Sequence, residues 1–549
     1  MSHVQGELEY VVTVKEGVDW QEVHNELTNP TKNNPSVDSN IIPDRVVEVV
    51  KLRPNNPRNT HYYLTKEEKD RLVNDPRIVD VKRFAHIGLP KANAFQDGEF
   101  NKNSLSSNQH DNWGLLRHIS ETNAYGASST DPGGTFDYVL DGTGVDMVIA
   151  DTGIQADHPE WQDANGVTRL KQIDWYAASG VSGSMPVNFY TDTDGHGTHC
   201  AGTMMGRYFG WAKNADIYNI THYGNSQAIS TADFIDCLLG WHNAKLGTRP
   251  TVVNMSFAYA FYLNTTDNPN RIQFSRGIDS GYYLTGGVYR GVAHTEVTRT
   301  NLRQYGINGE YQGSYNGKNV YGFPYRVASF DADIRSLTTA GIHVVMAAGN
   351  DSMKCDVPGG ADWDNYLEFT SDNVTFYRWY YHRGGTPSLY EAGSSFTAVP
   401  AVTKATGFNV GALGVSTGTL NSTLYEQKAT FSQSGPAVDI WTAGQYIISA
   451  QPSNMGSVYH YNNLFRQAKY SGTSMAAPQM CGMIGCLLQA HPDWTPEQVY
   501  NYFTSNAKPT MYDNGNDADY TNSLTTHGAP NRLAYFPLAA QRPFTITEV

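Results

Sequence analysis

The chain has few cysteines, few basic residues and no long apolar run. Its five cysteines in 549 residues are too few for a disulfide framework. Cys481 and Cys486 lie on one expected helix and point about 140° apart, so they should not bridge. The 39 lysines and arginines against 53 aspartates and glutamates give a net charge of −14, which argues against a nucleic-acid partner. No run of about 18 apolar residues is present, so we expect no membrane span.

The first residues also lack the charged and apolar regions of a Sec signal peptide. The localisation is therefore left unknown: the protein stays inside a cell, is assembled into a particle or leaves by another route. The length allows one large domain and a smaller one.

Ser-Gly-Thr-Ser-Met-Ala-Ala-Pro, from Ser471 to Pro478, is the stretch around which the chain is organised. It brings Ser474 to the start of an expected helix, where free backbone N–H groups and the helix dipole suit a developing negative charge. Taken alone, Gly-Thr-Ser favours a helix cap over a nucleophile. Pro478 is tolerable because it lies near the helix start.

Three upstream motifs favour a nucleophilic serine. An apolar run ends in Asp151-Thr-Gly, a helix of small residues begins at His196-Gly-Thr-His, and a second apolar run ends in Ala-Ala-Gly-Asn350. In an α/β sheet the strand C-termini and following helix N-termini meet at one crevice. The motifs and their Asp, His, Ser order resemble the subtilisin-like serine proteases over roughly residues 113 to 540.

The resemblance implies a role for each residue. Ser474 is the nucleophile, His196 takes its proton, and Asp151 orients His196 and stabilises its cation. The Asn350 side chain and the Ser474 backbone N–H form the oxyanion hole. The helix N-terminus should keep His196 neutral in the free enzyme.

The resemblance also implies a primary specificity pocket, along Ser256, Phe257 and Ala258 and along Ala348, Gly349 and Asp351. Ala258 stands where the family has glycine, so its methyl group should narrow the pocket mouth. Asp351 is expected at the pocket rim, where it would favour a basic P1 side chain, or else is a solvated loop carboxylate without effect.

Residues 1–100 predict a small separate domain. Expected strands at 8–14, 45–52, 59–64 and 78–84 and helices after Asp19 and Thr65 follow the split β-α-β-β-α-β order. This pattern resembles the propeptide of subtilases. A polar segment follows, with 101–112 as the linker, before the catalytic domain at 113–540.

Two insertions, near 257–325 and 352–391, are rich in tyrosine, tryptophan, glycine and asparagine. They either wall the substrate groove or dock a larger assembly, or they shield the sheet as extra hairpins.

Metal ligands are not expected. His196 and His199 have no third ligand at suitable spacing, and Asp192 and Asp194 lack the glutamate of a calcium loop. The calcium excursion that many subtilases carry after the histidine helix is absent at Gly206–Ala212. A structural calcium elsewhere stays possible but unplaced. Cys200 resembles the free cysteine beneath the catalytic histidine of some subtilases, or is a buried apolar filler.

The sequence thus predicts an α/β protein with a doubly wound, mostly parallel sheet behind a ferredoxin-like propeptide domain. Its predicted function is serine endopeptidase activity through an acyl-enzyme, autoprocessed from a proenzyme and needing no cofactor for the chemical step. Expected partners are polypeptide substrates and its own propeptide. The alternative is a vestigial subtilase scaffold with a structural role, for example in a virion.

Overall fold

We analysed a computed structural model of the chain. It describes residues 7–29, 43, 45–83, 89–92, 95–96, 112–121, 138, 140–245, 247–264, 271–275, 278–298, 301–308, 310–315, 318–324, 326–371, 376–385, 388–390, 404–420, 423–513 and 525–537. Of the predicted linker at 101–112, all but Asn112 lies outside these residues, as do parts of both insertions.

The N-terminal unit has the predicted β-α-β-β-α-β order. Its elements are β1 (Leu8–Val14), α1 (Trp20–Thr28), β2 (Val49–Lys51), β3 (Asn59–Leu64), α2 (Lys66–Leu72) and β4 (Ile78–Arg83). The described strands form an antiparallel sheet in the order β2-β3-β1-β4. Thr65 and Glu68 form the predicted capping box of α2. β2 is shorter than predicted because the N–H of Val47 donates to the carbonyl of Leu27 instead of to β3.

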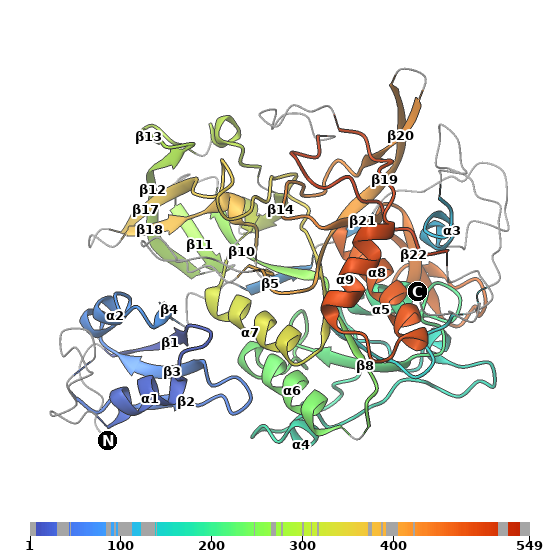
Figure 1. Cartoon of the computed structure of the whole chain (residues 1–549), viewed down its shortest axis with the longest axis horizontal. Coiled ribbons are helices and arrows are strands. Elements are labelled where there is room, and N and C mark those ends of the chain that lie inside the picture. The colour runs from blue at the N-terminus through green and yellow to red at the C-terminus, as the bar shows by residue number, and fades with distance from the viewer. Residues whose placement is uncertain are drawn as a thin grey trace.

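A mostly parallel sheet organises the larger part of the molecule (Figure 1). Seven of its strands lie in the described ranges, in the order β20-β19-β16-β9-β7-β8 with β21 beside β19. They are β7 (Asp146–Asp151), β8 (Asp216–Thr221), β9 (Thr251–Met255), β16 (His343–Ala347), β19 (Phe408–Leu420), β20 (Thr423–Lys428) and β21 (Ile440–Ala443). All pairs are parallel except β19 with β20.

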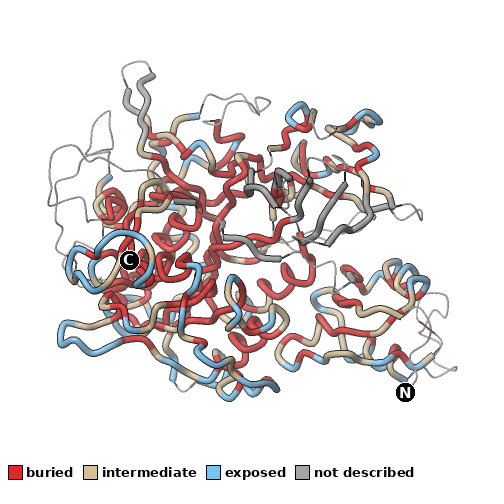
Figure 2. The backbone as a smooth tube through the Cα atoms, turned by 180° about the vertical axis from the view of Figure 1, so that it is seen from behind, coloured by how far each residue is buried: buried red, intermediate tan, exposed pale blue. Residues whose placement is uncertain are grey.

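The alternation of β7 shows that helices cover both faces of this sheet. Met147 and Ile149 pack into the core that holds α5 (His196–Met205), α8 (Thr473–Ala490) and α9 (Pro496–Asn506). Val148 and Ala150 point the other way, into the core that holds α4 (Trp175–Ser179), α6 (Thr231–Ala244) and α7 (Ala328–Thr339). Figure 2 shows this buried centre and the separate core of the N-terminal unit. The predicted doubly wound α/β fold is therefore present.

Both insertions contribute strands to one antiparallel sheet, which the sequence pattern does not reveal. In the described part it has nine strands: β5 (Leu89–Ala92), β10 (Phe257–Asn264), β11 (Arg271–Ser275), β12 (Ile278–Tyr289), β13 (Val292–His294), β14 (Glu310–Tyr315), β15 (Lys318–Pro324), β17 (Tyr366–Ser371) and β18 (Phe376–Trp379). β5, which precedes the large domain in the chain, pairs antiparallel with the start of β10, so that Ala92 lies opposite Phe257.

A further small sheet lies beside the start of α8. β24 (Arg466–Ser471) pairs with β22 (Ile447–Gln451), with β23 (Ser457–Val458) and with β6 (Phe95–Gln96). Phe95 is opposite Ser471. The segment that follows the N-terminal unit thus pairs with two different sheets. α3 (Trp113–Arg117) then begins the large domain, capped by Asn112.

The N-terminal unit packs against α6 and α7 through buried charges (Figure 1). Arg53 is 3% exposed, and its guanidinium donates to Asp236 of α6 and to Asp333 of α7, with closest N–O distances of 3.0 Å to each. Asn56 and Asn59 also donate to Asp333. One arginine therefore joins the unit to both helices.

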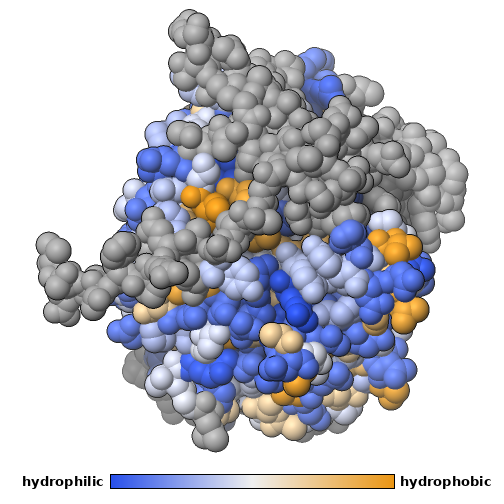
Figure 3. Space-filling view, turned by 90° about the vertical axis from the view of Figure 1, so that its right-hand side faces the viewer, coloured by the Kyte–Doolittle hydropathy of each residue, from blue (hydrophilic) through white to orange (hydrophobic). Residues whose placement is uncertain are grey.

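Among the described residues, every helix is too short or too polar to cross a bilayer. On the described part of the face seen in Figure 3, apolar side chains form small separate patches among hydrophilic ones.

Candidate active site

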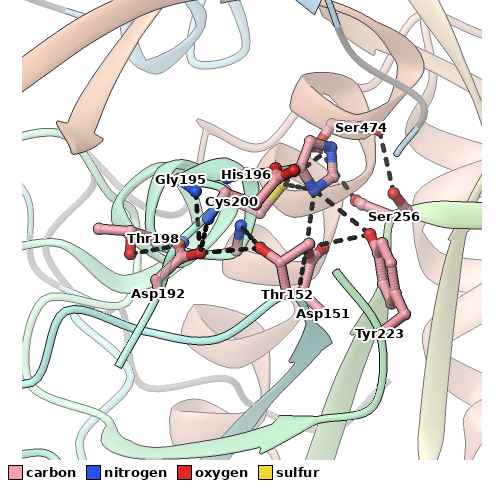
Figure 4. Close-up of polar contacts among 12 residues, drawn as sticks. Asp151, Thr152, Asp192, Gly195, His196, Thr198, Cys200, Tyr223, Ser256 and Ser474 are labelled. Atoms are coloured by element: carbon pink, nitrogen blue, oxygen red, sulfur yellow. Dashed lines mark hydrogen bonds and ion pairs between the residues drawn. The ribbon is translucent and has the colours of Figure 1, made fainter. Parts of the chain in front are cut away.

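The ends of β7 and α5 bring Asp151 and His196 together. Asp151 is the last residue of β7 and His196 the first of α5. Gly197 has no side chain, and a Cβ there would collide with the Gly153 carbonyl and press on Asp151. The glycine therefore lets the helix approach the strand closely enough for the two side chains to meet (Figure 4).

The carboxylate of Asp192 orders the turn before α5. It accepts hydrogen bonds from the backbone N–H groups of Asp194, Gly195 and Thr198 and from the hydroxyls of Thr152 and Thr198. Since both carboxylate oxygens are engaged by N–H and O–H donors, this turn does not fit a calcium ion.

The Asp151–His196 pair is buried and tightly bonded. His196 Nδ1 donates to Asp151 Oδ1 at 2.7 Å, and the two residues are 3% and 0% exposed. Burial alone would lower the pKa of His196, but the Asp151 carboxylate raises it well above its ordinary value. The expectation that the helix N-terminus keeps His196 neutral is therefore wrong, because the nearby full charge outweighs a partial one.

Ser474 is the second residue of α8, as predicted, and is buried. Its Oγ donates to the Ser256 carbonyl at 3.1 Å and, within the described part of the chain, makes no hydrogen bond to His196. Pro478 is the sixth residue of the helix, beyond the first turn, so the Ser474 carbonyl loses its helical donor. Cys200 Sγ and Ser256 Oγ donate to this carbonyl instead, at 3.3 and 3.1 Å.

Asn350 follows β16 and carries a buried amide donor that is unused. Its Oδ1 accepts from the backbone N–H and the hydroxyl of Thr473, at 2.9 and 3.0 Å. Because a backbone N–H can only donate, this contact identifies the oxygen of the side-chain amide. The Nδ2 atom then has no partner among the described residues. A donor of this kind beside Ser474 suits an oxyanion.

A pocket of about 490 Å³, its open mouth included, lies next to these residues. Of the residues predicted to form the specificity pocket, Phe257, Ala258, Ala348 and Gly349 line it. Ser256 does not line it and instead donates from its Oγ to the Ser474 carbonyl. The second insertion supplies much of the wall, which favours the substrate-groove interpretation for it. The insertion residues are Cys355, Arg383, Gly384, Gly385, Ser388, Leu389 and Tyr390.

Asp351 is not where the sequence predicts it. It is 4% exposed and is not among the lining residues. Its carboxylate accepts from Nε2 of Gln433, which lines the pocket and whose Oε1 accepts from the Cys355 thiol at 2.7 Å. Asp351 is therefore neither an acidic rim nor a solvated carboxylate, because Gln433 separates it from the pocket.

Cys200 lies directly against the His196 ring. Its Sγ is 3.9 Å from both ring nitrogens, and burial raises its pKa to about 11, so the thiol stays protonated. Asp151, His196 and Cys200 hold ligand atoms within 4.8 Å of one another. The aspartate and histidine are bonded to each other and the thiol is protonated, which does not favour a resident metal.

A lysine occupies the loop after α5. Lys213 Nζ donates to the carbonyls of Arg207, Tyr208 and Gly210, at 3.1, 3.5 and 2.7 Å. These inward carbonyls already have a cationic partner, so the loop does not fit a calcium ion either.

Sequence reasoning missed several residues that shape the site. Thr473 anchors Asn350, Asp192 orders the turn before His196, Gln433 lines the pocket, and the Tyr223 hydroxyl donates to Asp151. The Asp192-x-Asp194 spacing indicates only a possible calcium loop, which is set aside above, so it does not predict this role. Tyr223 and Gln433 carry no local signal, because long-range packing brings them to the site.

Several curated serine proteases are similar to this chain in sequence. The chain is 34% identical over 170 residues to proteinase R of Parengyodontium album, covering 29% of this chain and 36% of that protein. It is 26% identical over 215 residues to alkaline serine protease ver112 of Corniculantispora psalliotae, covering 39% and 47%. It is 24% identical over 385 residues to the subtilisin-like serine protease Cla h 9.0101 of Davidiella tassiana, covering 69% and 49%. The matches thus span about half or less of these relatives.

Among solved structures, fervidolysin from Fervidobacterium pennivorans matches 99% of this chain and 63% of its own, with 17% identity and a TM-score of 0.49. A cold-adapted subtilisin-like serine proteinase matches 77% of this chain and 97% of its own, with 20% identity and a TM-score of 0.42. The sequence model of the subtilase family, Peptidase_S8, matches residues 142–529, which include Asp151, His196, Asn350 and Ser474. With most of its length matched, the chain belongs to the subtilase family.

Proposed function

We propose that the protein is a serine endopeptidase whose catalytic residues are Asp151, His196 and Ser474. The observation that carries this proposal is the unused Asn350 amide beside Ser474, at the same site as the buried Asp151–His196 pair. An amide donor left free beside the proposed nucleophile is what an oxyanion hole requires.

The proposed reaction begins when the Ser474 hydroxyl turns from the Ser256 carbonyl towards His196 Nε2. His196 takes the hydroxyl proton as Oγ attacks the substrate carbonyl carbon, and Asp151 stabilises the imidazolium. Asn350 Nδ2 and the Ser474 N–H bind the oxyanion. His196 then protonates the leaving amine as the peptide C–N bond breaks, and water hydrolyses the acyl-enzyme. No step requires a cofactor.

Labelling with a fluorophosphonate probe tests this function directly. The active protein should take up one probe, and digestion followed by mass spectrometry should find it on Ser474. The vestigial scaffold predicts no labelling. Absence of labelling both before and after removal of the N-terminal unit would refute the endopeptidase proposal.

The raised pKa of His196 predicts activity that increases towards alkaline pH. His196 must be neutral to accept a proton, and a raised pKa keeps it charged and inactive up to higher pH. We expect the acid limb of kcat/KM to lie above about pH 6.5, the ordinary pKa of histidine. Initial rates on an uncharged peptide substrate measure this. A full plateau already at about pH 6 would contradict it.

We further propose that the N-terminal unit is an inhibitory propeptide cut by Ser474. β5 pairs with β10 so that Ala92 faces Phe257, and β6 pairs with β24 so that Phe95 faces Ser471, three residues before Ser474. A peptide that pairs with β10 at one end and with β24 at the other passes Ser474 between the two sheets. The cut is therefore expected between Ala92 and Phe95. Intact mass and N-terminal sequencing test this, and a stable, active uncut chain would favour a docking role.

Arg53→Ala should weaken inhibition by this unit. Loss of the guanidinium leaves Asp236 and Asp333 buried without their cation, and breaking a buried pair costs about 3–5 kcal/mol. The inhibition constant of the N-terminal piece added in trans should rise roughly a hundred- to several-thousand-fold. Lys66→Ala, which removes only an exposed pair with Asp70, is the control. Equal inhibition by both variants would exclude Arg53 as the main anchor.

A further inference from the structure

We propose that Tyr223 positions the Asp151–His196 pair, an inference that rests on the proposed function. Tyr223 lies two residues after β8 and is 8% exposed. Its hydroxyl donates to Asp151 Oδ1 at 3.1 Å, and the same oxygen is 3.5 Å from His196 Nδ1. Figure 4 shows the phenol ring reaching both side chains from the side opposite Asp192.

Three donors converge on one oxygen of Asp151. The Thr152 N–H and His196 Nδ1 donate to Oδ1 at 2.7 Å each, and the Tyr223 hydroxyl is the third donor. Oδ2 accepts no hydrogen bond from any described residue. Within the described ranges the carboxylate is therefore held through Oδ1, and His196 and Tyr223 are the side chains that bond to it.

The Tyr223 hydroxyl is suited to permanent donation. Burial, followed by the charge of Asp151, holds its pKa well above the ordinary value, so it stays protonated over the working pH range. Its ring contacts His222 at a centroid distance of 4.7 Å and Phe257 at 5.5 Å. Phe257 lines the pocket, so Tyr223 contacts both a pocket residue and the Asp151–His196 pair.

This arrangement sets the basicity of His196. A donor to Asp151 draws negative charge away from the imidazole and so holds the pKa of His196 lower than it would otherwise be. The hydroxyl oxygen near Nδ1 acts in the opposite sense, but at 3.5 Å its effect is the smaller one. The other charged or titratable groups around His196 are Asp151, Asp194, His199, Cys200 and Tyr470.

Tyr223→Phe in the otherwise unchanged protein tests the inference. We expect kcat to fall about tenfold at the pH optimum with KM nearly unchanged, since the lost bond positions the base and does not touch substrate. The acid limb of kcat/KM should move to higher pH by about half a pH unit. Tyr500→Phe is the matched control: it removes a tyrosine–carboxylate bond of 3.0 Å, to Asp439. An unchanged kcat and acid limb in Tyr223→Phe would overturn the inference.

A second variant covers the case in which Tyr223→Phe does not fold. 3-Fluorotyrosine at position 223 keeps the ring and makes the hydroxyl a stronger donor, so the acid limb should move to lower pH. A limb that stays in place or moves upward overturns the positioning role. The proposed function fails separately, if the wild-type protein does not label at Ser474.

Discussion

Replacing Ser474 by alanine is expected to reduce kcat for peptide hydrolysis roughly a million-fold, as for other enzymes of this type. The Ser474 hydroxyl makes one hydrogen bond, to the Ser256 carbonyl. Its loss should therefore change the free energy of unfolding by only about 1 kcal/mol. The variant should also remain one uncut chain, because the proposed autoprocessing uses the same serine.

Rates on a peptide substrate and gel analysis of the purified variant measure both effects. Ser457→Ala, on β23, removes a hydroxyl bond to Gln467 away from the site and is the control. Cleavage between Ala92 and Phe95 in pure Ser474→Ala protein would show that another protease makes the cut. Residual peptidase activity near that of wild type would exclude Ser474 as the nucleophile.

Replacing Asn350 by alanine is expected to lower kcat about a hundred- to a thousand-fold with KM almost unchanged. Its Nδ2 has no partner among the described residues, so the bond to the oxyanion forms mainly in the transition state. Steady-state kinetics separate the two constants. A raised KM at constant kcat would contradict the oxyanion assignment.

Asn350→Ala also removes the oxygen that accepts from Thr473, and Thr473→Val controls for that loss. The variant deletes the hydroxyl bond to Oδ1 and the acceptor of the Gly349 N–H, but it leaves the backbone N–H bond to Oδ1 and the Nδ2 donor. It should therefore lose much less activity than Asn350→Ala. Similar losses in the two variants would mean that the position of α8, and not the amide donor, is what Asn350 supplies.

Local patterns predicted the regular elements well. The strand at 8–14 and the capped helices after Asp19 and Thr65 agree with β1, α1 and α2, because periodicity and capping are encoded within a few residues. The insertion sheet was not predictable in this way, since its pairings join strands far apart in the chain, such as β10 with β5 and β12 with β17.

The candidate site shows the same difference: what local motifs encode was predicted, and what depends on long-range packing was not. Motif spacing predicted the meeting of Asp151 and His196, which lie at an element end and an element start. Asp351 was misplaced because the Gln433 side chain, from a distant segment, covers it. The pKa of His196 was misjudged because the charge at 2.7 Å outweighs a helix dipole.

Under the proposed function, the pairing of β5 with β10 and of β6 with β24 limits which proteins can be digested. A substrate bound as Leu89–Ala92 and Phe95–Gln96 are bound pairs through its backbone with β10 and with β24. A folded protein seldom exposes a stretch of backbone whose N–H and C=O groups are free to pair with both strands. Cleavage of globular substrates should therefore follow their local opening equilibria, which span from near zero to the full free energy of unfolding. Under the proposed function, the rate of cleavage therefore depends on the stability of the substrate as well as on its sequence.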